Sequence, residues 1–328
     1  MRRRRSRRLI PFVLLVLAGA HPALGQDVPE QGGAAFLLLP VGGRATALGQ
    51  AGTTAGGSGE AVFWNPAGLA RMPGSEFAIH YSETFVSNNS AITAFFVNER
   101  LGVLGAAVYL VDYGSQDVVP PGLDQPPTTG RSLQKNVALL ASYAIPAGRV
   151  AMGVTYKLVQ FRQDCQGDCG VLRSIVGTTH AIDVGLQVAL GPPDALTLGV
   201  ALRHAGFALQ LENRDQADPL PTRLQVGAAY RIEFKTVRSP QPIDVRVLVD
   251  LHERWRDLGS PEVRVGLDMG YGQLIRARAG YAWLDGDAGG PAIGLGVRID
   301  RIGVDIARTF FTAGTFEDPV YVSLRVLF

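Results

Sequence analysis

Apolar and polar residues alternate strictly along several segments in the C-terminal third of the chain. From Ile243 to His252, every second residue is aliphatic, and the residues between them are mostly charged or polar. The segments Glu262–Tyr271 and Val320–Phe328 show the same alternation. Because successive side chains of a β-strand point to opposite faces of the sheet, each segment predicts a strand with one apolar and one polar face.

Similar segments recur along most of the chain and predict about 14 strands. Most are about 10 residues long, the length that a tilted strand needs to cross a membrane. We therefore expect an all-β fold, a transmembrane antiparallel β-barrel formed by residues 76–328. The predicted strands are Glu76–Ser82, Ala91–Asn98, Leu101–Tyr113, Asn136–Ala144, Val150–Phe161, Thr179–Leu190, Leu196–Leu211, Arg223–Glu233, Ile243–His252, Glu262–Tyr271, Leu274–Trp283, Ala292–Asp300, Ile302–Phe310 and Val320–Phe328.

The links between the predicted strands alternate between long and mostly tight. Outer-membrane barrels likewise alternate long outer loops with short periplasmic turns, and an even number of strands leaves both barrel ends on the periplasmic side. No apolar run approaches the roughly 20 residues that a membrane-spanning helix needs. The predicted long links are Glu83–Ser90, Gly114–Lys135, Arg162–Thr178, Glu212–Thr222, Glu253–Pro261, Leu284–Pro291 and Phe311–Pro319.

Charged residues on the polar faces predict a polar lumen, because mixed charges beside small residues can pair there and bind water. A soluble β-sandwich or propeller would also alternate, but neither explains the two kinds of link. Arg308 falls on an apolar face and suits only a membrane interface, where its stem can snorkel. The predicted lumenal charges are Arg223, Arg231, Arg246, Arg264, Arg276, Arg278, Arg298, Arg325, Asp244, Asp250, Glu262, Asp268, Asp300 and Asp305.

The N-terminus has the features of a secretion signal. Arginines dominate the first eight residues, Leu9–Ala20 is a short apolar stretch, and Ala23-Leu24-Gly25 places small residues where a signal peptidase cleaves. We therefore predict a signal peptide over residues 1–25. The whole chain has a formal charge of +2, and this segment holds six arginines and no acid, so the mature chain carries −4. A nucleic-acid partner thus lacks an electrostatic basis.

Cys165 and Cys169 are the two cysteines of the chain and stand in Cys-Gln-Gly-Asp-Cys. Export implies an oxidising compartment, so we predict a disulfide between them. Two thiolates without a nearby histidine make a poor metal site, and a redox pair is more typically separated by two residues.

Residues 26–75 lack strand alternation and are rich in small residues. They include Gly-Arg-Ala-Thr-Ala-Leu-Gly-Gln-Ala-Gly at 43–52 and Phe-Trp-Asn-Pro-Ala-Gly-Leu-Ala at 63–70. Asn65 can cap a short helix whose first position is Pro66. The segment is therefore expected to be compact, rich in turns and closely packed inside a larger structure.

These two runs resemble the start of PorV/PorQ-family outer-membrane proteins, which lie within the superfamily of FadL-type transporters for long-chain fatty acids and other hydrophobic compounds. The resemblance implies a 14-stranded barrel whose lumen is partly filled by residues 26–75. It places the motif residues Trp64, Asn65, Pro66, Ala67 and Gly68 in that plug.

The resemblance implies two possible functions. FadL-like members pass hydrophobic small molecules through a gated lumen and a lateral opening, and this is the function that we expect, in the outer membrane of a Gram-negative-type bacterium. The alternative is a PorV-like, non-transporting shuttle that holds secreted proteins during type IX secretion. The expected partners are outer-membrane lipid, the barrel-assembly machinery, and a hydrophobic ligand or a secreted protein cargo.

The last strand ends in an aromatic residue. Barrel-assembly machinery recognises a final strand with alternating apolar residues and a terminal aromatic, so we predict that Tyr321 and Phe328 belong to an assembly signal. The alternative is an ordinary final strand that ends in Phe328 by chance.

Motifs that would indicate catalysis, a cofactor or a metal were not found. His80, His180, His204 and His252 lie on separate predicted strands without zinc-ligand spacing, and we expect them in the lumen or at an interface. No Gly-x-Ser-x-Gly elbow is present. Pairs such as Asp244 and Arg246 are interpreted as lumenal ion pairs. We therefore predict that the chain is not an enzyme and uses no cofactor.

Overall fold

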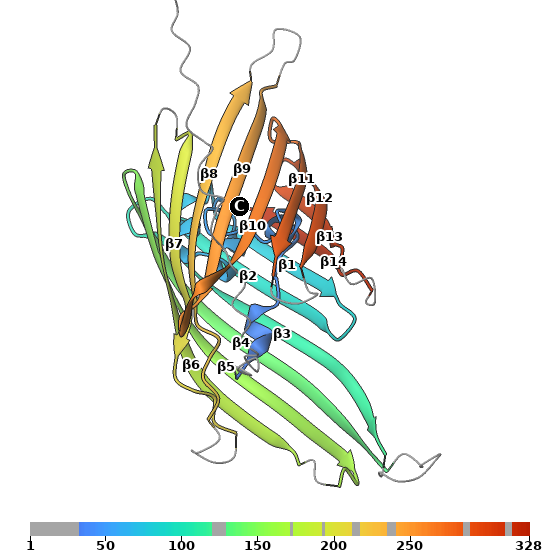
Figure 1. The fold of residues 1–328 in the computed structure, drawn as a ribbon. Coiled ribbons are helices and arrows are strands. Elements are labelled where there is room, and N and C mark those ends of the chain that lie inside the picture. Colours follow the sequence, from blue (N-terminus) through green and yellow to red (C-terminus); the bar gives the residue numbers. More distant parts are fainter. Residues whose placement is uncertain are drawn as a thin grey trace, which may run out of the picture. The chain divides into compact units, whose positions relative to one another are not determined.

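In the computed structural model, fourteen strands of the described residues close into an antiparallel barrel, as the sequence predicts (Figure 1). The structure describes residues 33–119, 129–170, 173–191, 194–211, 217–234, 241–284, 289–311 and 317–328, so the predicted signal peptide and residues 26–32 lie outside it. The strands are β1 (Glu76–Glu83), β2 (Asn88–Asn98), β3 (Gly102–Val118), β4 (Gly130–Ala147), β5 (Val150–Gly167), β6 (Ile175–Leu190), β7 (Leu196–Gly206), β8 (Arg223–Phe234), β9 (Ile243–Arg254), β10 (Asp257–Tyr271), β11 (Ile275–Trp283), β12 (Gly290–Ile299), β13 (Ile302–Thr309) and β14 (Val320–Leu327).

Each strand pairs with its neighbours in the sequence, and β1 pairs with β14 to close the wall. We call the end that carries the β1–β2 and β13–β14 connections the loop side, and the opposite end, which carries the β12–β13 connection, the turn side. No helix among the described residues is both long and apolar enough to cross a membrane.

The alternation predicted from the sequence separates an apolar outer wall from a polar lumen. On β9, Val249 and Leu251 are exposed on the outside, whereas Asp250 and His252 are buried inside. A wall of this kind suits lipid on the outside and charges within. Asp300 was wrongly assigned to the lumen. It lies exposed in the turn after β12 with a φ of 51°, a left-handed conformation that aspartate tolerates in turns.

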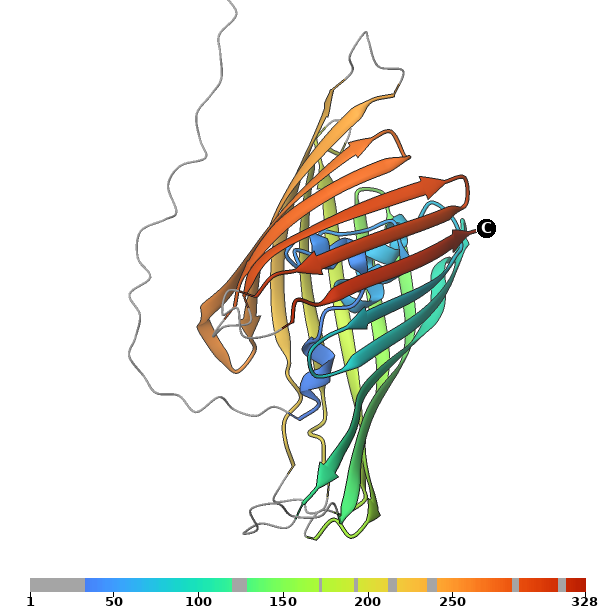
Figure 2. The same cartoon turned by 90° about the vertical axis from the view of Figure 1, so that its right-hand side faces the viewer.

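Strands β3–β6 continue past the other strands on the loop side and are longer there than predicted, as β10 also is (Figures 1 and 2). The links Gly114–Lys135 and Arg162–Thr178 are therefore shorter than expected. The extra residues are polar on both faces: Asp117 and Arg131 are cross-strand partners that form an exposed ion pair at 3.2 Å. Alternation cannot reveal such strands. The predicted long link Glu253–Pro261 was also wrong, because only two residues separate β9 from β10.

Strand β7 ends at Gly206, earlier than the predicted Leu211. The β6–β7 register shifts between Ile182 and Val184, and His204 opposite adopts a positive φ of 57°. The carboxylate of Asp183 accepts the His204 N–H at 2.8 Å, which supports this bulge. A bulge disrupts the ladder and bends the strand, so the chain beyond Gly206 leaves the wall.

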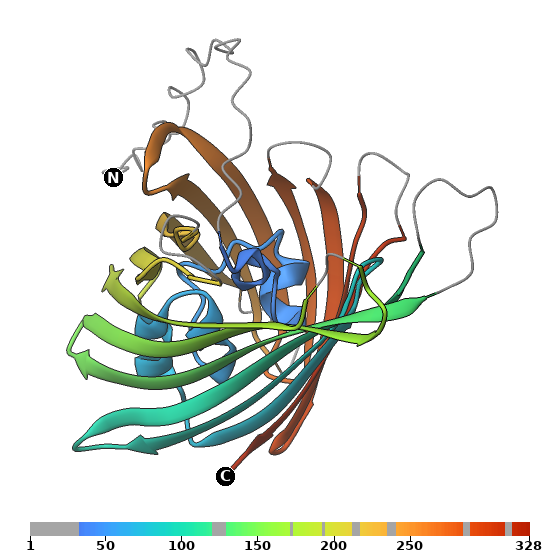
Figure 3. The same cartoon turned by 90° about the horizontal axis from the view of Figure 1, so that it is seen from below.

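The segment from Gly33 to Ser75, which we call the lumenal segment, lies inside the barrel (Figure 3). At the loop side, the Gly33 N–H donates to the Pro219 carbonyl, and at the turn side the Ser75 carbonyl accepts from the Phe328 N–H, both at 2.9 Å. The segment therefore crosses the lumen from one side to the other. Its helices are η1 (Ala35–Leu38), α1 (Gly43–Ala47), η2 (Gly59–Phe63) and η3 (Pro66–Arg71).

Candidate functional site

The five motif residues of the lumenal segment are buried where η3 meets β4–β6. As its place before Pro66 predicts, Asn65 caps η3, and its side-chain oxygen accepts the Ala67 N–H at 3.0 Å. The Asn65 amide nitrogen donates to the Thr53 carbonyl at 2.8 Å. The indole of Trp64 donates to the Val41 carbonyl at 3.0 Å. The motif thus connects three turns of the segment by hydrogen bonds.

Two wall glycines make room for the motif. Gly153 on β5 and Gly185 on β6 are cross-strand partners. A Cβ atom at Gly153 would collide with the Pro66 backbone, and one at Gly185 would collide with the Asn65 side-chain oxygen. The wall and the lumenal segment are therefore complementary in shape, a match that neither run of sequence reveals by itself.

Side chains of the barrel also accept hydrogen bonds from backbone N–H groups of the segment. Such groups would otherwise be buried without partners, so these bonds hold the segment in one position. The pairs are Gly43 with Ser323 at 2.9 Å, Thr53 with Asp250 at 2.7 Å and Gly59 with Glu76 at 2.7 Å.

Two cavities lie in the lumen on opposite sides of the segment. The loop-side cavity has a volume of about 490 Å³ and reaches the β1–β2 and β13–β14 connections. The turn-side cavity has a volume of about 530 Å³ and reaches Gln273 and Leu274 in the β10–β11 turn. They share no lining residue. The segment therefore separates two compartments.

One side of the loop-side cavity is apolar. The lumenal segment contributes Leu37–Val41 and Phe63, β4 contributes Leu140, and the loop-side connections contribute Phe85 and Phe310. Such a surface favours a hydrocarbon ligand, since burial of apolar area stabilises a complex by about 25 cal/mol per Å².

The tyrosine of β3 joins this apolar side. The ring of Tyr109 lies 6.2 Å from Phe36 and 6.0 Å from Phe63, measured between ring centroids. Its buried hydroxyl has no hydrogen-bond partner among the described residues. Since a buried polar group is normally hydrogen-bonded, Tyr109 is a candidate to donate to a bound molecule.

A neighbouring part of the cavity lining is cationic and lies on β5 and β7–β10. Lys157 forms a buried ion pair with Asp183 at 2.6 Å, and its Nζ lies 3.1 Å from His204 Nδ1. Arg264 pairs with Glu262 at 2.7 Å. In these two pairs, each cation has a carboxylate that balances its charge.

Arg203 differs from these cations. It is 7% exposed, and no carboxylate of the described residues lies within 4.0 Å of it. Its guanidinium lies over the Trp64 ring, 5.5 Å from the centroid. With the Gln225 amide oriented to satisfy its neighbours, the amide oxygen accepts from Arg203 Nη1 at 3.0 Å. The Arg203 Nε atom has no partner in the described chain, so a buried guanidinium without a direct carboxylate contact lines the cavity.

The sequence interpretation missed Lys157, Asp183 and Arg203. All three lie within predicted strands. The signal available in the sequence was a charged residue among the small residues on one face of each strand. Their meeting depends on strand register and on the β7 bulge, which alternation does not specify.

The predicted lumenal ion pairs form a chain along the inner wall. Arg276 contacts both Asp244 and Asp268 at 3.0 Å. Arg278 contacts Asp305 at 2.6 Å. The suggested pairing of Asp244 with Arg246 was wrong, because Asp244 contacts Arg276 on β11 and Arg231 on β8 instead.

The histidines divide between the two faces. His80, His204 and His252 are buried in the lumen, whereas His180 is exposed on the outer wall and stacks on Tyr156 with centroids 5.9 Å apart. Within the described ranges, no group of three His, Cys, Asp or Glu side chains could hold a metal.

The two aromatic residues predicted to form the assembly signal lie in different environments. Tyr321 is buried and lines the loop-side cavity, whereas Phe328 is exposed and meets Phe96 edge to face at 5.8 Å. Their place in an assembly signal stays a prediction.

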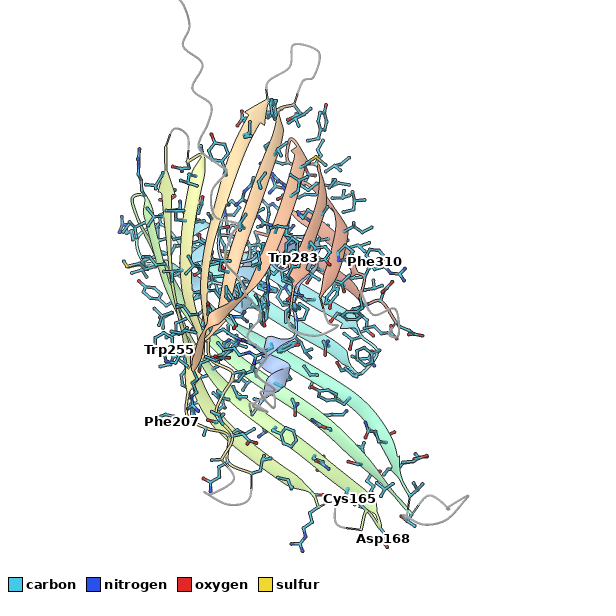
Figure 4. All side chains as sticks on the ribbon, viewed as in Figure 1. Cys165, Asp168, Phe207, Trp255, Trp283 and Phe310 are labelled. Atoms are coloured by element: carbon cyan, nitrogen blue, oxygen red, sulfur yellow. A yellow bond between two sulfur atoms is a disulfide. The ribbon has the colours of Figure 1, made fainter. Side chains whose placement is uncertain are left out.

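Cys165 and Cys169 form the predicted disulfide at the loop-side end of β5. Phe207, Trp255 and Trp283 are exposed at the loop-side ends of their strands, and Figure 4 shows Cys165 lying well beyond them. Aromatic side chains mark membrane interfaces on barrels. The disulfide thus lies on the part of β3–β6 that continues past the loop-side ends of the other strands. Arg308, predicted near an interface, pairs with Asp318 at 3.2 Å on the loop side.

Comparison with known proteins gives structural neighbours but no sequence relative. No protein-family model and no curated protein matches this chain. The toluene transporter TbuX of Ralstonia pickettii has a TM-score of 0.60 at 14% identity, covering 88% of this chain and 98% of that one. The monoaromatic hydrocarbon channel CymD gives 0.58 at 14% identity, with 89% and 98% covered. The P. putida toluene transporter TodX gives 0.56 at 12% identity, with 86% and 98% covered. At these identities the likeness shows a shared barrel fold.

Proposed function

We propose that this chain is a FadL-type transport barrel that binds hydrophobic small molecules in the loop-side cavity and passes them through the lumen. This proposal rests mainly on a lumenal cavity that has one apolar side, next to the buried Arg203, which has no carboxylate within 4.0 Å among the described residues. Its volume of about 490 Å³ suits a small ligand. The fold neighbours, described as toluene transporters and a monoaromatic hydrocarbon channel, support the same class of cargo.

The geometry favours cargo that has a hydrocarbon body and one acidic or hydrogen-bond-accepting end. The hydrocarbon part fits against Leu37–Val41 and Leu140, and the polar end fits Arg203 and the hydroxyl of Tyr109. An acid would neutralise the guanidinium and gain a charge-assisted hydrogen bond.

Passage requires the lumenal segment to move, since it separates the two cavities. Leu37–Val41 and Trp64 belong both to this segment and to the cavity lining. A bound molecule therefore contacts the barrier directly. It can favour an open arrangement only if it binds that arrangement more tightly than the closed one. Release of Trp64 from Arg203 by an acidic ligand would supply such a difference.

The fold and the exposed apolar wall support a place in the outer membrane of a Gram-negative-type bacterium. In that orientation, the loop side faces outward and the turn side faces the periplasm. The disulfide between Cys165 and Cys169 then lies on the oxidising, external side. Delivery by a signal peptide and insertion by the barrel-assembly machinery belong to the same proposal.

Binding of two matched ligands to the full-length protein in detergent tests the proposed cargo. Decanoic acid and decanol share a hydrocarbon chain and differ in the head group. We expect Arg203→Met to weaken decanoic acid binding about tenfold or more, because a hydrogen bond to a charged group contributes roughly 1.5–3 kcal/mol. Decanol binding should change far less.

Arg131→Met is the matched control, since Arg131 is exposed on the loop-side extension and far from the cavity lining. It should leave both affinities unchanged. If wild-type protein bound neither ligand, the transport proposal would fail. If Arg203→Met affected acid and alcohol equally, the assignment of the acidic end would be wrong.

A PorV/PorQ-like adaptor in protein secretion is a second candidate function. The rigid loop-side extension of β3–β6, with its disulfide, offers a surface that could hold a protein. Photo-cross-linking from Asp168 in cells tests this candidate. Reproducible adducts with secreted proteins would favour the adaptor, and adducts absent under conditions of active secretion would count against it.

A further inference from the structure

The turn-side cavity is strongly basic. Eight arginines and a single acid, Asp305, line it. A smaller adjoining cavity of about 220 Å³ shares five lining residues with it and adds Asp194 and Asp244, but no further arginine. Like charges in a confined space repel one another unless counter-charges are present.

Half of these arginines are neutralised by the wall. Arg231, Arg276, Arg278 and Arg325 each contact at least one carboxylate within 4.0 Å. The carboxylates are shared: Asp244 serves Arg231 and Arg276, and Asp305 serves Arg278 and Arg325. Asp244 and Asp305 are therefore already engaged by these four arginines.

The other four arginines have no carboxylate partner in the described part of the chain. Arg44 and Arg71 donate only to backbone carbonyls, those of Gly56 and Arg149, at 2.9 Å. The side chains of Arg246 and Arg298 make no hydrogen bond and no ion pair within 4.0 Å with any described residue.

These four guanidinium groups come from both the lumenal segment and the barrel wall. Arg44 and Arg71 belong to the lumenal segment, and Arg246 and Arg298 belong to the wall. Burial is the main cause that lowers the pKa of Arg44 to about 10; the neighbouring Arg278 adds to this drop, and Asp268 opposes it. Repulsion between Arg44 and the wall arginines acts between the segment and the wall, and an anion placed between them would relieve it.

We propose that the turn-side cavity binds a multivalent oxyanion of the phosphate type between Arg44 on the lumenal segment and Arg246 and Arg298 on the wall. The planar guanidinium fork matches phosphate oxygens in a bidentate manner. Several unpaired guanidinium groups around one space call for more than one negative charge, which favours a phosphate group over a single carboxylate. The site shares no residue with the loop-side cavity and does not rest on the proposed transport.

Isothermal titration of the full-length protein in detergent with sodium pyrophosphate tests the proposal. We expect saturable binding to wild-type protein, and at least about tenfold weaker binding after the double change Arg246→Gln and Arg298→Gln. Neither side chain has an ion pair to lose, so the fold should persist. The heat-modifiable gel migration of the barrel checks this.

Arg131→Gln is the control and should bind as wild type does, since Arg131 lies on the loop-side extension. Arg44→Gln changes the lumenal segment instead of the wall and should also weaken pyrophosphate binding. Titrations with inorganic phosphate and with glycerol phosphate distinguish a free ion from a phosphate ester. Absence of saturable pyrophosphate binding, or equal binding by the double variant, would overturn the proposal.

Discussion

The loop-side and turn-side cavities occupy one lumen and have similar volumes, about 490 and about 530 Å³. Their linings differ sharply. The loop-side cavity combines an apolar surface from the lumenal segment with one unpaired arginine, whereas the turn-side cavity is almost wholly arginine-lined. Both the wall and the lumenal segment create this difference. The segment supplies much of the apolar surface on the loop side, whereas six of the eight turn-side arginines belong to wall strands and two to the segment.

The charges at the two ends are also balanced differently. Near the loop side, Lys157 and Asp183 form a pair that is almost fully buried, and no second Lys or Arg of the described residues lies within 4.0 Å of Asp183. Near the turn side, Asp305 contacts both Arg278 and Arg325. An isolated buried pair fails when one partner is lost, whereas a network retains a second partner.

The largest expected effect tests this contrast in charge balance. Lys157→Met would leave Asp183 buried without its cation, and we expect a loss of about 3–5 kcal/mol in unfolding free energy. Arg325→Met should cost clearly less, because Asp305 retains Arg278 at 2.6 Å. Urea titration followed by heat-modifiable gel migration measures both. Equal losses would show that the two ends do not differ in this way.

A smaller effect concerns how the stability of the barrel depends on pH through Glu60 of the lumenal segment. Burial raises the pKa of Glu60 from 4.5 to about 7, with Asp305 adding to the rise and Arg44 and Arg325 opposing it. Because the folded pKa exceeds the unfolded one, the stabilisation is complete below about pH 4.5 and is lost as the pH rises through about 7.

We therefore expect the barrel to lose about 1–3 kcal/mol between about pH 5 and about pH 8, and Glu60→Gln to remove most of this loss. Glu99→Gln, in an exposed turn, is the control and should leave the pH dependence intact. Identical pH profiles for wild type and Glu60→Gln would contradict the assignment.

The smallest effect on stability concerns the barrier between the cavities. Gly185→Val would push against the Asn65 side chain, and overpacking of this kind typically costs about 1–3 kcal/mol. The displaced segment should connect the two cavities and raise ion conductance in planar bilayers. Ala228→Val, on the outer face of β8, adds the same kind of bulk without touching the segment and should leave conductance unchanged. If Gly185→Val left the ion conductance unchanged, the contact between Gly185 and Asn65 would not be what holds the barrier in place.

The barrel could be predicted from the sequence because alternation is a local property of each strand. All fourteen predicted strands overlap observed ones, and the cap made by Asn65 follows from its position before Pro66. The loop-side ends of β3–β6 could not be predicted, because strands that are polar on both faces leave no alternation.

The candidate site was largely beyond prediction for a different reason. Arg203 meets Trp64 only because the β7 bulge and the path of the lumenal segment bring distant parts of the chain together. The fit of Gly153 and Gly185 around the motif likewise depends on register. Such long-range matches are properties of the closed barrel and leave no periodic pattern in the sequence.

The most direct test of the proposed function is a crystal structure of the protein bound to a brominated decanoic acid, with the bromine located by anomalous scattering. We expect the bromine in the loop-side cavity near Leu37–Val41 and the carboxylate against Arg203. A ligand found only on the outer wall, or with its carboxylate among the turn-side arginines, would contradict the division of roles between the two cavities.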